Sequence, residues 1–93
     1  MATDTEVAES RGKVKIAPRG LRERAAVAVL DMAQRFKSDI LLCAGSLCID
    51  AKSSMMALML LEAVKGEELD VTARGEDSRE AVQALSEAFQ KAA

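Results

Sequence analysis

Arg19-Gly20-Leu21-Arg22-Glu23-Arg24-Ala25 is the stretch in which a short predicted strand (residues 13–17) ends and a predicted helix (about 22–36) begins. Pro18 and Gly20 interrupt the extended chain, and an alanine-rich helix former follows at once. The first turn of a helix presents free backbone N–H groups and the positive end of the helix dipole, so anions bind there. The alternative is a set of solvated arginines. An anion- or partner-binding site is therefore predicted from four residues of this stretch: Arg19, Gly20, Arg22 and Arg24.

Composition narrows the classes of function. The chain has 93 residues, enough for one small domain, and a net charge of −2. That charge argues against nucleic acid as a partner, and two phenylalanines without tryptophan or tyrosine leave little to stack on bases. The longest apolar run, residues 55–61, is far shorter than the roughly 20 residues that span a bilayer. Because the N-terminal residues also lack the features of a secretory signal, we predict a cytoplasmic protein.

Histidine is absent from the sequence. Its absence excludes imidazole general bases, histidine-ligated zinc, phosphohistidine chemistry and Ser-His or Cys-His nucleophiles on this chain. We expect no catalytic residue, no enzyme activity and no cofactor, and two cysteines are too few ligands for a metal site.

Residues 39–51 alternate in a pattern that predicts a β-hairpin about Gly45-Ser46, with positive φ at the glycine. Counting outward from this turn places Cys43 opposite Cys48 on the outer face, which also carries Lys52. Directly opposed Cβ atoms lie about 4.5–5.5 Å apart, farther than the roughly 3.8 Å of a disulfide. Since disulfides are also uncommon in cytoplasmic proteins, we expect two reduced thiols, with a redox switch as the alternative.

The pattern of elements predicts a single α+β domain over residues 13–93, preceded by a disordered N-terminal tail at 1–12. Residues 69–73 alternate again and are expected to form the fourth strand. The order β-α-β-β-α-β-α then predicts an open-faced sandwich, in which a four-stranded antiparallel sheet is covered on one face by three helices.

The ends of the second and third predicted helices carry recognisable capping residues. Ser53 or Ser54 is expected to cap the second helix, and Lys65-Gly66 to end it. Asp77, with Glu80 three residues later, is expected to form a capping box at the start of the last helix.

Three motifs resemble those of HPr, the histidine-containing phosphocarrier family of the bacterial sugar phosphotransferase system. The family's Gly-Leu-His-x-Arg-Pro-Ala turn is matched by residues 20–26. Its Ala-Lys-Ser before a Met-rich helix is matched from Ala51, and its Gly-Glu-Asp before the last helix by Gly75-Glu76-Asp77. The resemblance covers about residues 13–92 and implies the HPr-like fold.

The sequence departs from the family pattern at the residue that carries the phosphoryl group. The phosphorylatable histidine aligns with Arg22 and the following proline with Ala25, whereas a family arginine is kept as Arg24. Arginine is charged at any working pH and cannot accept a phosphoryl group in this role. The chain is therefore similar to catabolite-repression HPr-like proteins, in which a phosphorylated serine promotes binding of a transcription regulator. That serine corresponds to Ser53 or Ser54; we favour Ser53, and an unmodified N-cap is the alternative.

Residues 55–61 are apolar in succession, so on a helix they cover every side and one sheet cannot bury them all. Methionines on an exposed patch adapt to more than one partner surface. We therefore predict a partner-docking patch that includes Met55, Met56 and Met59. A loosely packed core helix is the alternative.

The function predicted from these features is a regulatory protein-docking module of a phosphotransferase or carbon-regulation system, with serine phosphorylation as a candidate switch. One alternative is a divergent phosphocarrier component that uses another residue, and a second is a structural or oligomerisation module. The resemblance implies protein partners: an HPr-kinase-like kinase, a transcription regulator or phosphotransferase enzymes. We expect no direct nucleic-acid or membrane partner, and a monomer or a weak homodimer.

Overall fold

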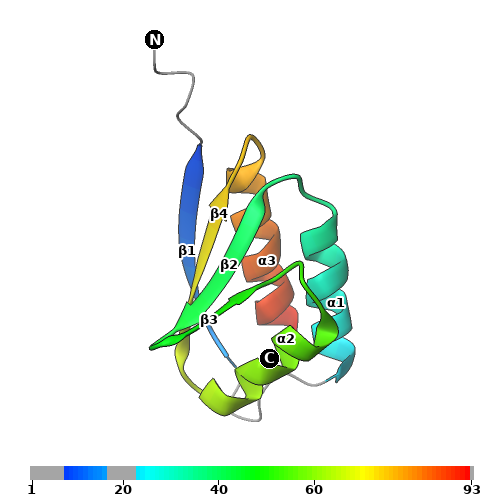
Figure 1. The fold of residues 1–93 in the computed structure, drawn as a ribbon, viewed down its shortest axis with the longest axis vertical. Helices are drawn as coiled ribbons and strands as arrows, with labels where there is room; N and C mark the ends of the chain where they lie inside the picture. Colours follow the sequence, from blue (N-terminus) through cyan, green and yellow to red (C-terminus); the bar gives the residue numbers. More distant parts are fainter. Residues whose placement is uncertain (1–7, 17–22, 93) are drawn as a thin grey trace.

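A computed structural model describes residues 8–16 and 23–92, and within them the elements follow the predicted order (Figure 1). The strands are β1 (Glu9–Lys15), β2 (Asp39–Ala44), β3 (Leu47–Asp50) and β4 (Glu68–Arg74). The helices are α1 (Glu23–Gln34), α2 (Met55–Met59), α3 (Ser78–Ala92) and a short 3-10 helix, η2 (Leu60–Val64).

The four strands form one antiparallel sheet in the order β1-β4-β2-β3. Helices α1, α2 and α3 lie on one side of it, as Figure 1 shows. Side chains along β2 and β4 alternate between buried and solvent-facing positions, so the sheet has one core face and one open face. The predicted α+β open-faced sandwich is confirmed. The largest fully buried apolar side chains are Ile16, Val29, Leu42, Leu58, Leu61, Leu69, Val71 and Leu85.

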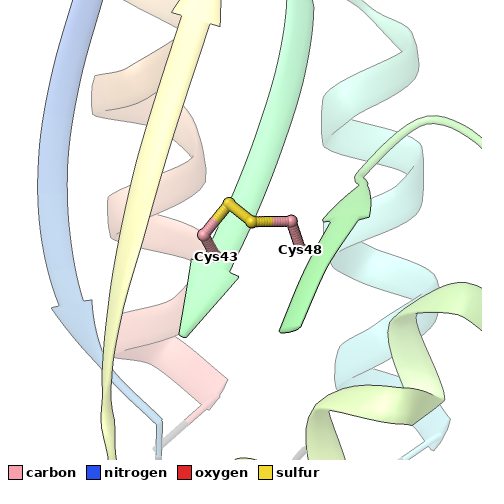
Figure 2. The surroundings of a disulfide bond; sticks show 2 residues. All are labelled: Cys43 and Cys48. Atoms are coloured by element: carbon pink, nitrogen blue, oxygen red, sulfur yellow. A yellow bond between two sulfur atoms is a disulfide. The ribbon is translucent and has the colours of Figure 1, made fainter. Parts of the chain in front are cut away.

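The hairpin between β2 and β3 has the predicted register, with Cys43 opposite Cys48 and Ala44 opposite Leu47. Gly45 has φ of 61°, as expected at the first position of this two-residue turn. The expectation of reduced thiols is wrong, because the two cysteines are joined by a disulfide (Figure 2). The prediction used the average Cβ spacing of directly opposed residues, but this pair is closer than average. Its Cα atoms are 4.1 Å apart, against about 4.5–5.5 Å in antiparallel pairs generally.

Strand β1 begins at Glu9, so the prediction of a disordered tail is wrong for residues 9–12; residues 1–7 lie outside the described part of the chain. Glu9 is opposite Arg74 at the end of β4, and their side chains form an ion pair of 3.5 Å. These N-terminal residues lack the apolar alternation that reveals a strand in sequence. They are extended because the β4 backbone offers its hydrogen-bonding groups along their whole length.

The second helix is shorter than predicted. Ser54 caps α2, its Oγ accepting a hydrogen bond from the Ala57 N–H at 3.1 Å, so the expected serine cap is confirmed at one of its two candidates. After five residues the chain tightens into η2 instead of continuing as an α-helix. Gly66, with φ of 85°, follows the helical segment in the left-handed conformation that the sequence predicted.

Candidate functional site

The predicted arginine site is described only in part. Arg19, Gly20 and Arg22 lie outside the described residues. Arg24 lies in the first turn of α1, where its side chain is exposed. Val27, three residues later and so on the same side of α1, is an exposed apolar residue.

The two candidate serines have different hydrogen bonds. The Ser53 hydroxyl donates to the backbone oxygen of Asp50 at 2.9 Å, whereas the Ser54 hydroxyl is the cap of α2. The Asp50 carboxylate in turn accepts the backbone N–H of Lys52 at 2.8 Å. Both serines are exposed. The turn from β3 to α2 therefore presents two accessible hydroxyl groups, one used as a donor and one as an acceptor.

Lys52 connects this turn to the loop between α1 and β2, a role that the sequence did not reveal. Its ammonium group donates to the backbone oxygens of Phe36 at 2.8 Å and Ser38 at 3.2 Å. The Gln34 side-chain amide donates back to the Lys52 backbone oxygen at 2.8 Å. Lys52 was predicted on the outer sheet face, but β3 ends at Asp50 and the strand alternation no longer applies two residues later. The two carbonyl oxygens belong to the loop after α1, which ends at Gln34. They lie 16 and 14 residues before Lys52, so no local sequence pattern marks the contact.

The predicted methionine patch is exposed in part. Met56 is 79% exposed and Met59 38%, and the neighbouring Leu60 is 52% exposed. Met55 is half-buried and packs against the core. Because α1 also packs against α2, exposed apolar side chains occur on two adjoining helices.

Asp77 performs a different task from the predicted capping box. Its carboxylate accepts the backbone N–H groups of Lys37 at 2.8 Å and Ser38 at 2.9 Å, and also the Ser38 hydroxyl. The Ser38 hydroxyl first, and then the Lys37 N–H, hold the pKa of Asp77 below its ordinary value, because these bonds favour the carboxylate. The capping-box prediction was wrong for this side chain, since the loop before β2 competes successfully for it.

Neither a metal site nor a membrane span is found in the described residues. No group of three or more acidic or cysteine side chains there could hold an ion. None of the helices traced in those residues has the length and apolar character to cross a bilayer.

Comparison with known proteins decides the family. Residues 11–91 match the model of the PTS HPr component phosphorylation site, which spans nearly all of the described chain. This chain belongs to the HPr family. The HPr fold, inferred at first from three sequence motifs, is the fold that the sheet order and helix placement display.

Relatives within the HPr family include proteins with and without the phosphocarrier name. The chain is 39% identical over 67 residues to the HPr-like protein Crh of Bacillus subtilis, covering 72% of this chain and 78% of that protein. It is 38% identical over 71 residues to phosphocarrier protein HPr of Xylella fastidiosa, covering 76% and 79% of the two chains. The crystal structure of HPr from Bacillus anthracis superposes with a TM-score of 0.76 at 30% identity, covering 87% and 96%.

Proposed function

We propose that this HPr-family protein is a regulatory docking module that does not carry phosphate on histidine. The observation that carries the proposal is the absence of histidine from the whole sequence of a protein of this family. On the motif alignment Arg22 occupies the family's phosphorylation position, and a guanidinium cannot take over the nucleophilic role. A permanent positive charge at this position suits recognition of an acidic or phosphorylated partner, with Arg19, Gly20 and Arg24 beside it.

The proposed docking surface combines charge with adaptable apolar side chains. Arg24 and Val27 of α1 supply a cation and an exposed apolar group. Met56, Met59 and Leu60 supply the larger apolar part on α2 and η2. Flexible methionines allow one surface to fit more than one partner, which a regulatory protein requires. Met55 contributes less, because it is partly occupied in the core.

A serine switch fits the turn from β3 to α2. Phosphorylation of Ser53 would remove its hydrogen bond to the Asp50 backbone oxygen and put a dianion beside the Asp50 carboxylate. The turn would then change both in charge and in local structure, next to the exposed methionines. Ser54 is the second candidate, and its modification would act on the cap of α2.

The partners follow from the family. They are proteins: an HPr-kinase-like kinase, a transcription regulator or phosphotransferase enzymes. The protein acts in the cytoplasm as a monomer or weak homodimer, without enzyme activity, cofactor, or direct contact with nucleic acid or membrane.

The serine switch is tested by incubating the protein with HPr kinase and ATP, followed by intact-mass and peptide mass spectrometry. One phosphoryl group on Ser53 is expected, removed by Ser53→Ala and retained in the matched control Ser54→Ala. The reverse pattern would move the switch to Ser54. No adduct on either serine would refute it.

The loss of the carrier function is tested separately, with the phosphorylated first enzyme of the phosphotransferase system as donor. The expected result is no stable label on this protein, while a histidine-containing HPr in the same assay is labelled. Stable label on this chain would contradict the regulatory proposal and favour the divergent phosphocarrier.

A further inference from the structure

The disulfide between Cys43 and Cys48 is a reactive group that the proposed function does not use. It joins β2 to β3 across the hairpin, and Figure 2 shows the two sulfur atoms bridging the strands. The cysteines are five positions apart in the sequence and directly opposite in the register. Pairing therefore depends only on the hairpin and not on a distant part of the fold.

The register explains why these thiols meet. In a two-residue hairpin the pair next to the turn, Ala44 and Leu47, exchanges backbone hydrogen bonds, and the next pair does not. Non-hydrogen-bonded pairs have the closer Cα atoms, here 4.1 Å apart. The hairpin holds the two sulfur atoms within reach of each other, so that after reduction the bond can re-form within one molecule.

The two sulfur atoms differ in how easily an attacking thiolate can reach them. Both lie on the open face of the sheet, but Cys48 is exposed and Cys43 is half-buried. Cys43 has β3 on one side and Asp70 of β4 directly opposite on the other. In the sheet that the described residues form, β3 is an edge strand next to β2. An attacking thiolate therefore reaches Cys48 from the face or the edge, whereas at Cys43 it would approach the Asp70 carboxylate and be repelled.

We propose that Cys43 and Cys48 form a reversible dithiol–disulfide site that accepts electrons from a dithiol reductant and sets how firmly β3 is held. A thiolate of the reductant attacks the Cys48 sulfur, the bond between the two cysteines breaks, and Cys43 leaves as a thiolate that takes up a proton. The second thiol of the reductant attacks the mixed disulfide and releases the Cys48 thiol. Two electrons pass to the protein, and the reductant becomes a disulfide.

Strand β3 is the part of the fold that we expect to loosen when the disulfide is reduced. It has four residues, and its last residue, Asp50, builds the turn to α2. The Asp50 backbone oxygen accepts both the N–H and the hydroxyl of Ser53, and its carboxylate accepts the Lys52 N–H. Removing the cross-link leaves a short edge strand to open locally, and this turn opens with it. Strands β1 and β4 pair with each other and are not cross-linked, so they stay closed.

The redox step is tested by equilibrating the protein in mixtures of reduced and oxidised dithiothreitol, then alkylating the free thiols and measuring the intact mass. Molecules with zero or two alkyl groups are expected, exchanging at one midpoint ratio without dimers. Two alkyl groups throughout, even in the fully oxidised mixture, or disulfide-linked dimers as the main product, would overturn the proposal.

The structural consequence is tested by amide hydrogen exchange on the reduced and oxidised forms. Residues 47–54 are expected to exchange roughly tenfold faster after reduction, with β1 and β4 changed much less. The Cys43→Ser/Cys48→Ser variant is the control: it should exchange like the reduced protein and ignore the reductant. Equal exchange in both redox states would overturn the role for β3. Neither measurement involves a kinase or a phosphotransferase, so the redox site and the serine switch can each be refuted independently of the other.

Discussion

The turn from β3 to α2 and the turn from β4 to α3 each place an aspartate before a helix, yet the two aspartates bond to different parts of the chain. Asp50 bonds within its own turn, to the Lys52 N–H two residues later. Asp77 bonds to the loop before β2, at Lys37 and Ser38, about forty residues away. The first turn keeps Ser53 and Ser54 exposed, whereas the second is closed around buried Ser38 and Ser78.

This difference separates a turn that can change from one that holds the fold. A turn with local hydrogen bonds can rearrange without disturbing other elements, because few of its partners lie elsewhere. A turn whose side chains join distant loops opens only when the tertiary structure opens. Lys52 is the exception in the first turn, since its ammonium group reaches the loop after α1.

The largest effect is expected from Gly75→Ala in the closed turn. Gly75 has φ of 150°, and an added Cβ would lie 2.7 Å from the Ser38 Cα. Strained backbone and this overlap should together lower the free energy of unfolding by about 3 kcal/mol. The matched control is Gly45→Ala, where φ is 61° but an added Cβ meets no atom of the described residues within 4 Å, with an expected cost of about 1 kcal/mol. Urea denaturation measures both, and equal costs would contradict the close contact at Gly75.

Asp77→Asn should have the next largest effect, because an amide cannot accept all the hydrogen bonds that the carboxylate accepts from Lys37 and Ser38. The melting temperature of Asp77→Asn should fall further below wild type than that of the control Asp50→Asn.

The pKa of Asp77 is lower in the folded protein than its ordinary 3.8, so between the two values the unfolded state binds more protons. The difference between wild type and Asp77→Asn should therefore be complete above about pH 4 and shrink as the pH falls through the lowered pKa. A difference independent of pH down to acid unfolding would contradict this role.

Lys52→Met tests the contact that joins the open turn to the loop between α1 and β2. Losing the hydrogen bonds to Phe36 and Ser38 leaves backbone oxygens unpartnered and should cost about 1–1.5 kcal/mol. The control Lys65→Met breaks an exposed ion pair with Glu62 and should cost less than about 0.5 kcal/mol. Chemical denaturation of both variants gives the comparison, and similar costs would mean that the Lys52 bonds contribute little.

The serine substitutions should have the smallest effects. Ser54→Ala removes the cap of α2 and should cost about 1 kcal/mol. Ser53→Ala removes one exposed hydrogen bond to Asp50 and should cost about 0.5 kcal/mol. Thermal unfolding followed by circular dichroism ranks the two. A larger loss for Ser53→Ala would show that its bond holds the turn more firmly than the cap holds α2.

Much of the fold was predictable because its signals are local. Alternation over β2 and β3, with Gly45 at the turn, gave the hairpin register residue by residue. Gly66 marked the end of the second helical segment. The start of β1 was missed, since Glu9 and the residues after it show no apolar pattern and are extended only through their pairing with β4.

The sequence predicted that methionines of the candidate site would be exposed, but not which of them the core would cover. The exposure of Met56 and Met59 followed from a run of apolar residues too long for one helix face to bury. Met55 was assigned to the same patch, but the side of α2 that faces the core is set by how the helix packs. The arginine turn around Arg22 remains a sequence prediction.

By itself, the sequence determined the order of the elements, the faces of the hairpin and the absence of histidine chemistry, because each depends on residue type and spacing alone. The closeness of Cys43 and Cys48 also follows from the predicted register, because the Cα atoms of a non-hydrogen-bonded pair lie about 1 Å closer than those of a hydrogen-bonded pair. Only the tertiary structure decided which groups Asp77 and Lys52 bind. Both sets of bonds depend on loops brought together by folding across many intervening residues.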